Sequence, residues 1–273
     1  MTEPGRMRRV AEAAMALSFA MVVVPPVLAG EAAAQQAAPP AAAAEPHGGP
    51  PSPAGHELFF GAVLVDQAEV RSNGRGQGIY AFRGLGSYGT DYDRIQLNLH
   101  AESNEAARSL ERAELQVLYS RLVAYFWDLQ LGVRHDVRIA PRGGTPGRAY
   151  GVVGLQGLAP GFFHVNLQAF LGDRGVPLIR AEAAYDLLIT NRLVLQPEAE
   201  LNFAMGRDEA ALIAPGLYRM EAGLRLRYEI TREVAPYVGI SYERAVGGAA
   251  GLARRLGEKP EATAVVAGVR LFF

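Results

Sequence analysis

Polar and apolar residues alternate along most of the chain after residue 57. In "LVLQPEAELNF", which begins at Leu193, the polar residues Gln196, Glu198, Glu200 and Asn202 occupy every second position. Side chains of a strand point alternately to its two faces, so this pattern predicts a β-strand with one polar and one apolar face. The alternation recurs in "RIQLNLHAE", "FHVNLQAFL", "IRAEAAYDLL" and "YRMEAGLRLRYEI".

Weaker alternation extends the series. The further segments are 62–71, 78–88, 111–120, 126–136, 150–157, 236–244 and 263–273. Together they predict about twelve strands of about ten residues, the length that a tilted strand needs to cross a bilayer. An even number of strands is typical of bacterial barrels. We therefore predict an all-β fold, a transmembrane antiparallel up-and-down β-barrel of the bacterial outer-membrane type.

The connections support this interpretation, because they alternate in length if the first strand runs outward. Short turns are predicted at 89–92, 121–125, 158–161, 188–192 and 231–235. Mostly longer connections lie between them, among them "VRIAPRGGTPGRA", "MGRDEAALIAPGL" and "AVGGAAGLARRLGEKPE". Short turns at one rim and long loops at the other are the outer-membrane layout. Aromatic residues near the strand ends, Trp127 included, predict interfacial girdles.

Two other folds fit parts of the pattern. An exported soluble β-sandwich also alternates, but the strand number and the alternating loop lengths favour the barrel. The segment 149–172 has no charged residue and is long enough for a membrane helix, yet "GLAPG" at its middle predicts a hairpin. Pro197 lacks a backbone donor, so a local bulge is expected there.

The N-terminus predicts export. Three arginines precede a largely apolar stretch, and small residues follow at 32–34, so residues 1–34 are predicted to be a signal peptide. A single membrane anchor is the alternative, which Pro25 and Pro26 disfavour. Residues 35–57 are rich in Ala and Pro and are predicted to be a disordered linker. Residues 58–273 would form the barrel.

Charge and cysteine content narrow the function classes. The net charge is −1 and argues against nucleic acid as a partner, and the chain has no cysteine for disulfides or thiolate metal sites. In a membrane barrel the apolar face meets lipid, so the ionised side chains are enclosed in a narrow lumen. There we expect Arg180, Arg225 and Arg227 to form ion pairs. Their expected partners are Glu182, Glu198, Glu200, Glu221 and Glu229.

Longer phrases resemble one family. They are "LYSRLVAYFWDLQLGVRHD", "GLQGLAPGFF", "AEAAYDLLITNRLVLQPEAELNF", "EAGLRLRYEITREVAPYVGISYER" and "VVAGVRLFF". From about Leu58 to the C-terminus the chain resembles the copper-resistance protein B (CopB/PcoB) family of bacterial outer-membrane barrels. The resemblance implies a location in the outer membrane, copper ions as ligand and a contribution to copper tolerance. Members often carry a Met/His-rich N-terminal region, whereas this linker holds only His47 and His56.

Imidazole suits copper, and carboxylates join it for Cu(II). Strand direction places His100, His135 and Asp136 near the outer rim, with Asp66 and Glu69 near it too. The resemblance also includes His135 and Asp136 in "VRHD" and Asp128 in "FWDLQ". His135 has the parity of the lipid-facing residues, while Asp128 and Asp136 face the lumen. The expected metal ligands are His135, Asp136, His100, Asp128, Asp66 and Glu69.

The leading hypothesis is a non-enzymatic barrel that binds copper and passes or sequesters it at the outer membrane. Its partners would be copper ions, membrane lipid and a periplasmic copper-handling protein. The alternative is a narrow general porin or a structural barrel without specific metal binding. An outer-membrane hydrolase is disfavoured, because no G-x-S-x-G occurs and Ser87 and Ser120 have no histidine at a suggestive spacing.

Overall fold

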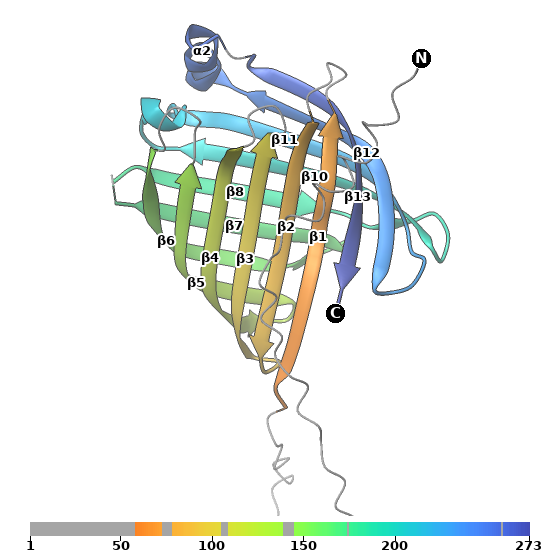
Figure 1. Ribbon diagram of the computed structural model, residues 1–273. Helices are drawn as coiled ribbons and strands as arrows, with labels where there is room; N and C mark the ends of the chain where they lie inside the picture. Colours follow the sequence, from red (N-terminus) through yellow and green to blue (C-terminus); the bar gives the residue numbers. More distant parts are fainter. Residues whose placement is uncertain (1–57, 73–77, 105–108, 139–144, 174, 258) are drawn as a thin grey trace, which may run out of the picture. The chain divides into compact units, whose positions relative to one another are not determined.

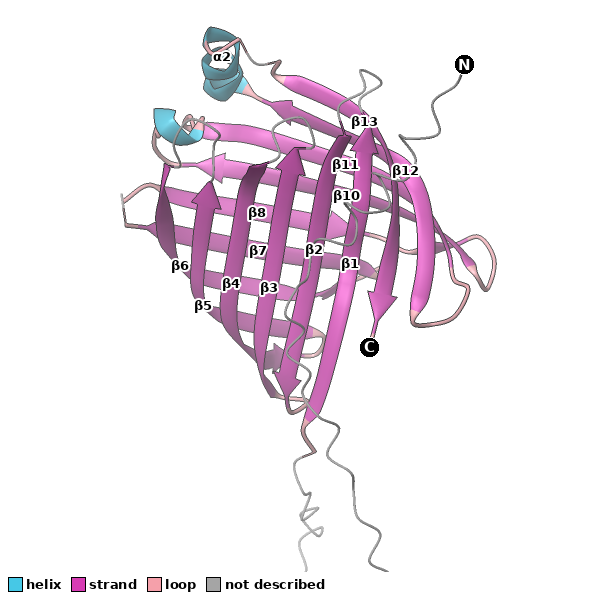
Figure 2. Ribbon diagram, viewed as in Figure 1, coloured by secondary structure: helices cyan, strands magenta, loops and turns pink. Residues whose placement is uncertain are grey.

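The computed structural model describes residues 58–72, 78–104, 109–138, 145–173, 175–257 and 259–273 (Figures 1 and 2). The predicted signal peptide and linker lie outside these ranges and stay predictions. The strands are β1 (Phe60–Ser72), β2 (Gly78–Gly89), β3 (Asp93–Asn104), β4 (Ser109–Ala124), β5 (Trp127–Arg138), β6 (Thr145–Ala159), β7 (Phe163–Gly172), β8 (Pro177–Ala184), β9 (Leu187–Leu188), β10 (Leu193–Ala204), β11 (Gly216–Tyr228), β12 (Val234–Ala245) and β13 (Glu261–Phe272). A 3-10 helix η1 (Glu209–Ala211) and a helix α2 (Gly247–Arg255) lie in the loops.

The strands form one closed antiparallel sheet. Strands that follow one another in the sequence pair, apart from β8 and β9, which both pair with β10. The last strand β13 pairs with β1, with Leu64 opposite Phe272. The short β9 continues β8, because both pair with β10 and keep the same register. The thirteen strands therefore make a twelve-stranded barrel, which confirms the predicted fold class. The segment 149–172 is the hairpin of β6 and β7.

Pro197 does not produce the expected bulge. The register of β10 against β11 runs through it without a shift, with Pro197 opposite Leu224. The irregularity appears on the other neighbour, where β8 ends at Ala184 and β9 starts at Leu187. Tyr185 N–H still donates to the Pro197 carbonyl at 3.1 Å. Proline has no N–H to return that bond, so the ladder is interrupted at this pair while the register is kept.

The outer wall of the barrel is apolar and its interior is polar. Side chains on the outer face such as Val133, Val238 and Val265 are more than half exposed, whereas Gln130, Glu69 and Arg225 are buried. A water-soluble sandwich would show the reverse, so the apolar wall is the surface that meets lipid. Among the residues that the structure describes, no helix is long and apolar enough to cross a membrane.

The two rims differ as predicted. Short turns join strands at one end, which also holds the start of β1 and the end of β13, and we call it the inner end. In outer-membrane barrels this end faces the periplasm. At the opposite, outer end lie the connections that contain η1 and α2. Exposed aromatic residues collect at the inner end, including Phe60, Tyr88, Tyr125, Phe162 and Phe272, as expected for an interfacial girdle.

Threonine side chains shape three of the inner turns. Thr90 Oγ1 accepts hydrogen bonds from the N–H of Tyr92 and of Asp93, at 3.3 and 3.1 Å. Thr190 Oγ1 accepts from Leu193 N–H at 2.9 Å, and Thr231 Oγ1 accepts from Val234 N–H at 3.2 Å. A hydroxyl that binds the backbone two or three residues later closes a turn locally, so these threonines help to fix where each strand restarts.

Candidate functional site in the barrel lumen

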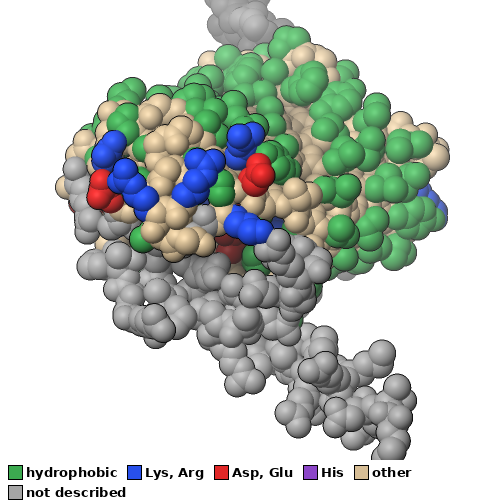
Figure 3. All heavy atoms as spheres, turned by 90° about the horizontal axis from the view of Figure 1, so that it is seen from above, with side chains coloured by type: hydrophobic (Ala, Val, Ile, Leu, Met, Phe, Trp, Pro, Cys, Tyr) green, Lys and Arg blue, Asp and Glu red, His purple; other side chains and the backbone are tan. Residues whose placement is uncertain are grey.

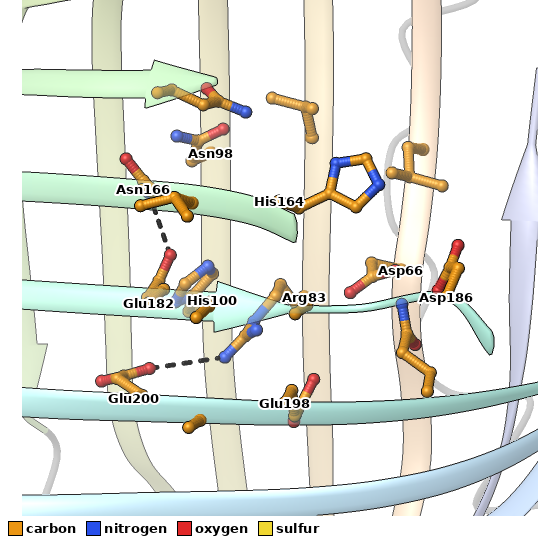
Figure 4. A pocket seen from close by; sticks show the side chains of 18 of the residues that line it. Asp66, Arg83, Asn98, His100, His164, Asn166, Glu182, Asp186, Glu198 and Glu200 are labelled. Atoms are coloured by element: carbon orange, nitrogen blue, oxygen red, sulfur yellow. Dashed lines mark hydrogen bonds and ion pairs between the residues drawn. The ribbon is translucent and has the colours of Figure 1, made fainter. Parts of the chain in front are cut away.

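The lumen contains a cavity of about 440 Å³ in the inner half of the barrel (Figure 4). Asp128 and His164, the second residues of β5 and β7, line the part of the cavity that is nearest to the inner turns. Among its lining residues are two imidazoles, several carboxylates and two guanidinium groups, namely His100, His164, Asp66, Asp128, Glu182, Asp186, Glu198, Glu200, Arg83 and Arg270. The wall is thus rich in groups that bind cations.

A single ion pair lies where this inner cavity meets a smaller one. Arg83 Nη2 lies 3.7 Å from Glu200 Oε2, and both residues also line a second cavity of about 50 Å³ nearer the outer end. Arg83 stands on β2 and Glu200 on β10, strands separated by six others on one side of the barrel and four on the other. The pair therefore reaches across the bore and narrows it.

The outer half of the lumen is filled by a cluster around Glu114. Arg180 donates to the two carboxylate oxygens of Glu114 at 2.8 and 2.9 Å, and Arg134 lies 2.8 Å from the same carboxylate. Arg134 also donates twice to Asp136, at 2.6 and 2.7 Å. Its guanidinium sits 4.6 Å from the ring centre of Phe170. Paired, hydrogen-bonded ions can be buried in this way without a large cost.

A second cluster centres on Glu69, whose side chain is fully buried. Arg225 donates to it at 3.1 and 3.2 Å, Arg71 at 2.7 Å, and the Tyr237 hydroxyl at 3.0 Å. Arg225 also pairs with Glu198. All acceptor capacity of Glu69 is used by these partners, so the cluster ties β1 to β11 and β12.

Neutral glutamines fill the lumen beside β3 to β7. Gln130 Nε2 donates to Gln96 at 2.8 Å and to Gln156 at 2.5 Å. Gln168 Nε2 donates to Gln130 and to Gln116, both at 3.2 Å. Because each amide is both donor and acceptor, the row closes this side of the lumen without adding charge.

The ion pairs predicted from the sequence are confirmed in part. Arg180, Arg225 and Arg227 pair with Glu200, Glu198 and Glu229 respectively. Sequence reasoning missed the stronger partners Glu69 and Glu114, because these pairs join strands that are not adjacent in the sheet. Glu221 pairs with Arg219 at 2.7 Å instead of with the three predicted arginines.

Three of the six predicted metal ligands line the inner cavity, namely His100, Asp66 and Asp128. Asp66 is the seventh of the thirteen residues of β1, so it lies at the middle of the strand and not near the outer rim. It is 3.4 Å from Arg270, while Asp128 accepts a hydrogen bond of 2.5 Å from Arg94. Both carboxylates thus already hold one guanidinium.

The other three predicted ligands are not brought to this cavity. His135 is exposed on the outer wall, where its ring lies against Gly147 of the next strand. This confirms its predicted lipid-facing parity. Asp136 is bound to Arg134, and Glu69 belongs to the cluster described above. Among the described residues, no three His, Asp or Glu side chains form a group ready to hold a metal ion.

Two residues that were not predicted as ligands complete the inner cavity. His164 lies on its wall near the inner end, at a polar position of the alternating segment "FHVNLQAFL". Glu182 accepts a hydrogen bond of 2.9 Å from Asn166, and no arginine of the described chain lies within ion-pair distance of it. Three buried oxygens of the lining, on Asp128, Asn166 and Asp186, have no hydrogen-bond donor among the described protein groups.

Comparison with known proteins identifies the family. The family described as "Copper resistance protein B precursor (CopB)" matches residues 59–273. Copper resistance protein B of Escherichia coli is 39% identical over 212 residues, which cover 77% of this chain and 69% of that protein. The chain belongs to the copper resistance protein B family. A homolog of copper resistance protein B from Pseudomonas syringae pv. tomato is 38% identical over 226 residues, covering 81% of this chain and 74% of that protein.

This copper resistance protein B family member is also similar to solved porin structures. It is similar to the NanC porin, with a TM-score of 0.48 and 14% identity over 78% of this chain and 99% of that chain. For the KdgM porin the TM-score is 0.45 and the identity 12%, with the same coverage. The strand pairing of the chain itself establishes the closed barrel. Because the chain forms a closed barrel with an apolar outer wall and belongs to this family, the protein is located in the bacterial outer membrane.

Proposed function

We propose that this barrel binds copper ions in its inner cavity and contributes to copper tolerance by holding or passing them at the outer membrane. The observation that supports this most is the pair His100 and His164 in one carboxylate-rich cavity of a copper resistance protein B family member. Imidazole nitrogens and carboxylate oxygens are suitable ligands for Cu(II). The proposal assigns no catalytic activity to the barrel.

The proposed ligands line the inner cavity from four different strands. His100 and Asp66 come from β3 and β1, whereas Asp128 and His164 come from β5 and β7. Glu182 adds a carboxylate that accepts a hydrogen bond from Asn166 and has no arginine within ion-pair distance in the described chain. The oxygens without a donor on Asp128 and Asp186 add acceptor sites. His135, Asp136 and Glu69 lie elsewhere and stay predicted ligands outside this cavity.

The proposal is tested by copper titration of the purified barrel. We expect wild-type protein to bind copper saturably and the H100A/H164A variant to bind it at least about tenfold more weakly, because both imidazoles of the cavity are removed. The readout is bound metal after dialysis at a series of free copper concentrations. H135A is the matched control, because it removes a histidine that points away from the lumen.

The outcomes separate the proposal from its alternative. Equal loss in H135A and H100A/H164A would argue against the inner cavity, and no saturable binding in wild-type protein would contradict copper binding itself. In that case a narrow porin or a structural barrel is favoured, since ion pairs fill much of the lumen. Because the cavity reaches the inner end, the proposal includes exchange of copper with a periplasmic copper-handling protein.

A further inference from the structure

Four cationic side chains lie at the outer end of the barrel, near the end of β12, in the last turn of α2 and just before β13. Figure 3 shows Lys and Arg side chains on this end of the molecule. All four are exposed, and they are Arg244, Arg254, Arg255 and Lys259. Arg244 is the last lipid-facing residue of β12. Arg254 and Arg255 lie in the last turn of α2, and Lys259 lies just before β13. We call these four residues the cationic rim.

The helix α2 holds its part of the cationic rim in place. Its alanines at 249, 250 and 253 are buried, and Val246 N–H donates to the Tyr218 carbonyl at 2.9 Å just before the helix. The alanine face therefore packs on the barrel. Arg254 and Arg255 point away from that contact and remain exposed.

The cationic rim differs from the arginines of the lumen in having no ion-pair partner. Within the described chain no carboxylate lies within 4.0 Å of any of its four charges, whereas Arg134, Arg180 and Arg225 each hold at least one. Glu261 is the acidic group that faces Arg244 across the β12–β13 pair. Its carboxylate accepts a hydrogen bond of 3.4 Å from Tyr242. The rim therefore keeps a net positive charge.

A cavity of about 290 Å³ lies within the cationic rim. It is enclosed by the end of β12, the helix α2 and the start of β13, and both Arg244 and Arg254 line it. Pro260 and Ala250 supply apolar parts of the wall, and Glu261 lies at one side. A compact anion could thus be contacted by two guanidinium groups at once.

The succession of residues on the outer face of β12 sets the height of the rim in the membrane. Val238 and Ile240 are more than half exposed and face lipid, Tyr242 follows, and Arg244 comes last. Each two-residue step along a strand is about 7 Å, so the charge stands just beyond the apolar band. Leu256, beside Arg255, is 68% exposed, as is typical of an interfacial position.

We propose that the cationic rim binds the phosphate groups of lipid A in the outer leaflet of the outer membrane. Guanidinium groups bind phosphate oxygens through paired hydrogen bonds, which Arg244 and Arg254 can supply from two sides of their cavity. Exposed Leu256 lies beside Arg255, and exposed Ile240 lies further into the apolar band on the same face of β12 as Arg244, so both suit the acyl chains of the same molecule. This inference is independent of copper binding.

The test compares lipid binding by the full-length protein in detergent. Native mass spectrometry would measure the affinity for bis-phosphorylated lipid A and for its dephosphorylated form. We expect wild-type protein to prefer the phosphorylated form by about tenfold and R244Q/R254Q to lose this preference. R192Q/R232Q is the matched control, because it removes two exposed arginines from the inner turns. Heat-modifiable migration on a gel would confirm that each variant folds.

Three results would overturn the proposal. The first is equal binding of the two lipid A forms by wild-type protein, and the second is equal loss in R192Q/R232Q. The third concerns the source of the phosphate: inorganic phosphate that binds as tightly as lipid A would assign the rim to free anions. Failure of inorganic phosphate to compete at millimolar concentration, together with the loss in R244Q/R254Q, supports the lipid.

Discussion

Replacing Glu114 with alanine is expected to lower the free energy of unfolding by about 3–5 kcal/mol. The carboxylate is 3% exposed and holds Arg134 and Arg180, whose side chains are themselves about nine-tenths buried. Its removal leaves two guanidinium groups close together with fewer acceptors, and like charges in a buried site repel. Arg180 would keep only longer polar contacts, 3.4 Å to Glu200 and 3.3 Å to Asn202. The measurement is denaturant unfolding of the refolded barrel in detergent.

The control for this prediction is E243A. Glu243 lies 2.9 Å from Arg219, but its side chain is 42% exposed and Arg219 keeps Glu221 at 2.7 Å. An exposed ion pair contributes little, so the expected loss is below about 1 kcal/mol. Similar losses for E114A and E243A would show that the lumen is solvated enough to screen the Glu114 cluster.

Removing both Arg83 and Glu200 as R83A/E200A is expected to raise ion conductance through the barrel by roughly tenfold. These side chains meet across the bore and lie on the boundary between the inner and the outer cavity. Truncation joins the two cavities, and removal of both side chains leaves neither member of this pair without its partner. Single-channel recording in planar bilayers with potassium chloride would measure the change.

R219A/E243A serves as the control for conductance. It removes an arginine–glutamate pair, 2.9 Å apart, from the neighbouring strands β11 and β12, so the bore is not crossed there. Its conductance should equal that of the wild type. If R83A/E200A conducts no better than wild type, the clusters of Glu114 and Glu69 alone close the lumen and the Arg83–Glu200 pair does not control passage.

Much of the fold could be predicted because alternation is a local signal. The predicted segments 111–120 and 263–273 correspond to β4 (Ser109–Ala124) and β13 (Glu261–Phe272). Alternation does not fix where a strand ends. The predicted segment stops at residue 120, whereas β4 runs on to Ala124 through exposed residues that a turn could also contain. Pro197 shows a further limit. Its missing N–H is evident from the sequence, but β10 itself stays continuous, and the interruption falls between β8 and β9 on the neighbouring side.

The lumen was harder to predict for a different reason. Alternation tells which face a side chain occupies, and it placed His100 and Asp128 correctly in the interior. It does not tell which strands face each other across the bore, because that depends on the tilt and stagger of the closed sheet. Hence Glu114 and Arg180, separated by three strands, could not be paired from the sequence.

The pairing of the first strand with the last has a consequence for biogenesis. Backbone hydrogen bonds join Val63 to Phe273, the final residue of the chain. A polypeptide that stops a dozen residues early would lose β13 and leave β1 and β12 as open edges with unsatisfied amides, which invite aggregation. The barrel can therefore close only after β13 has been delivered to the membrane, when it pairs with β1.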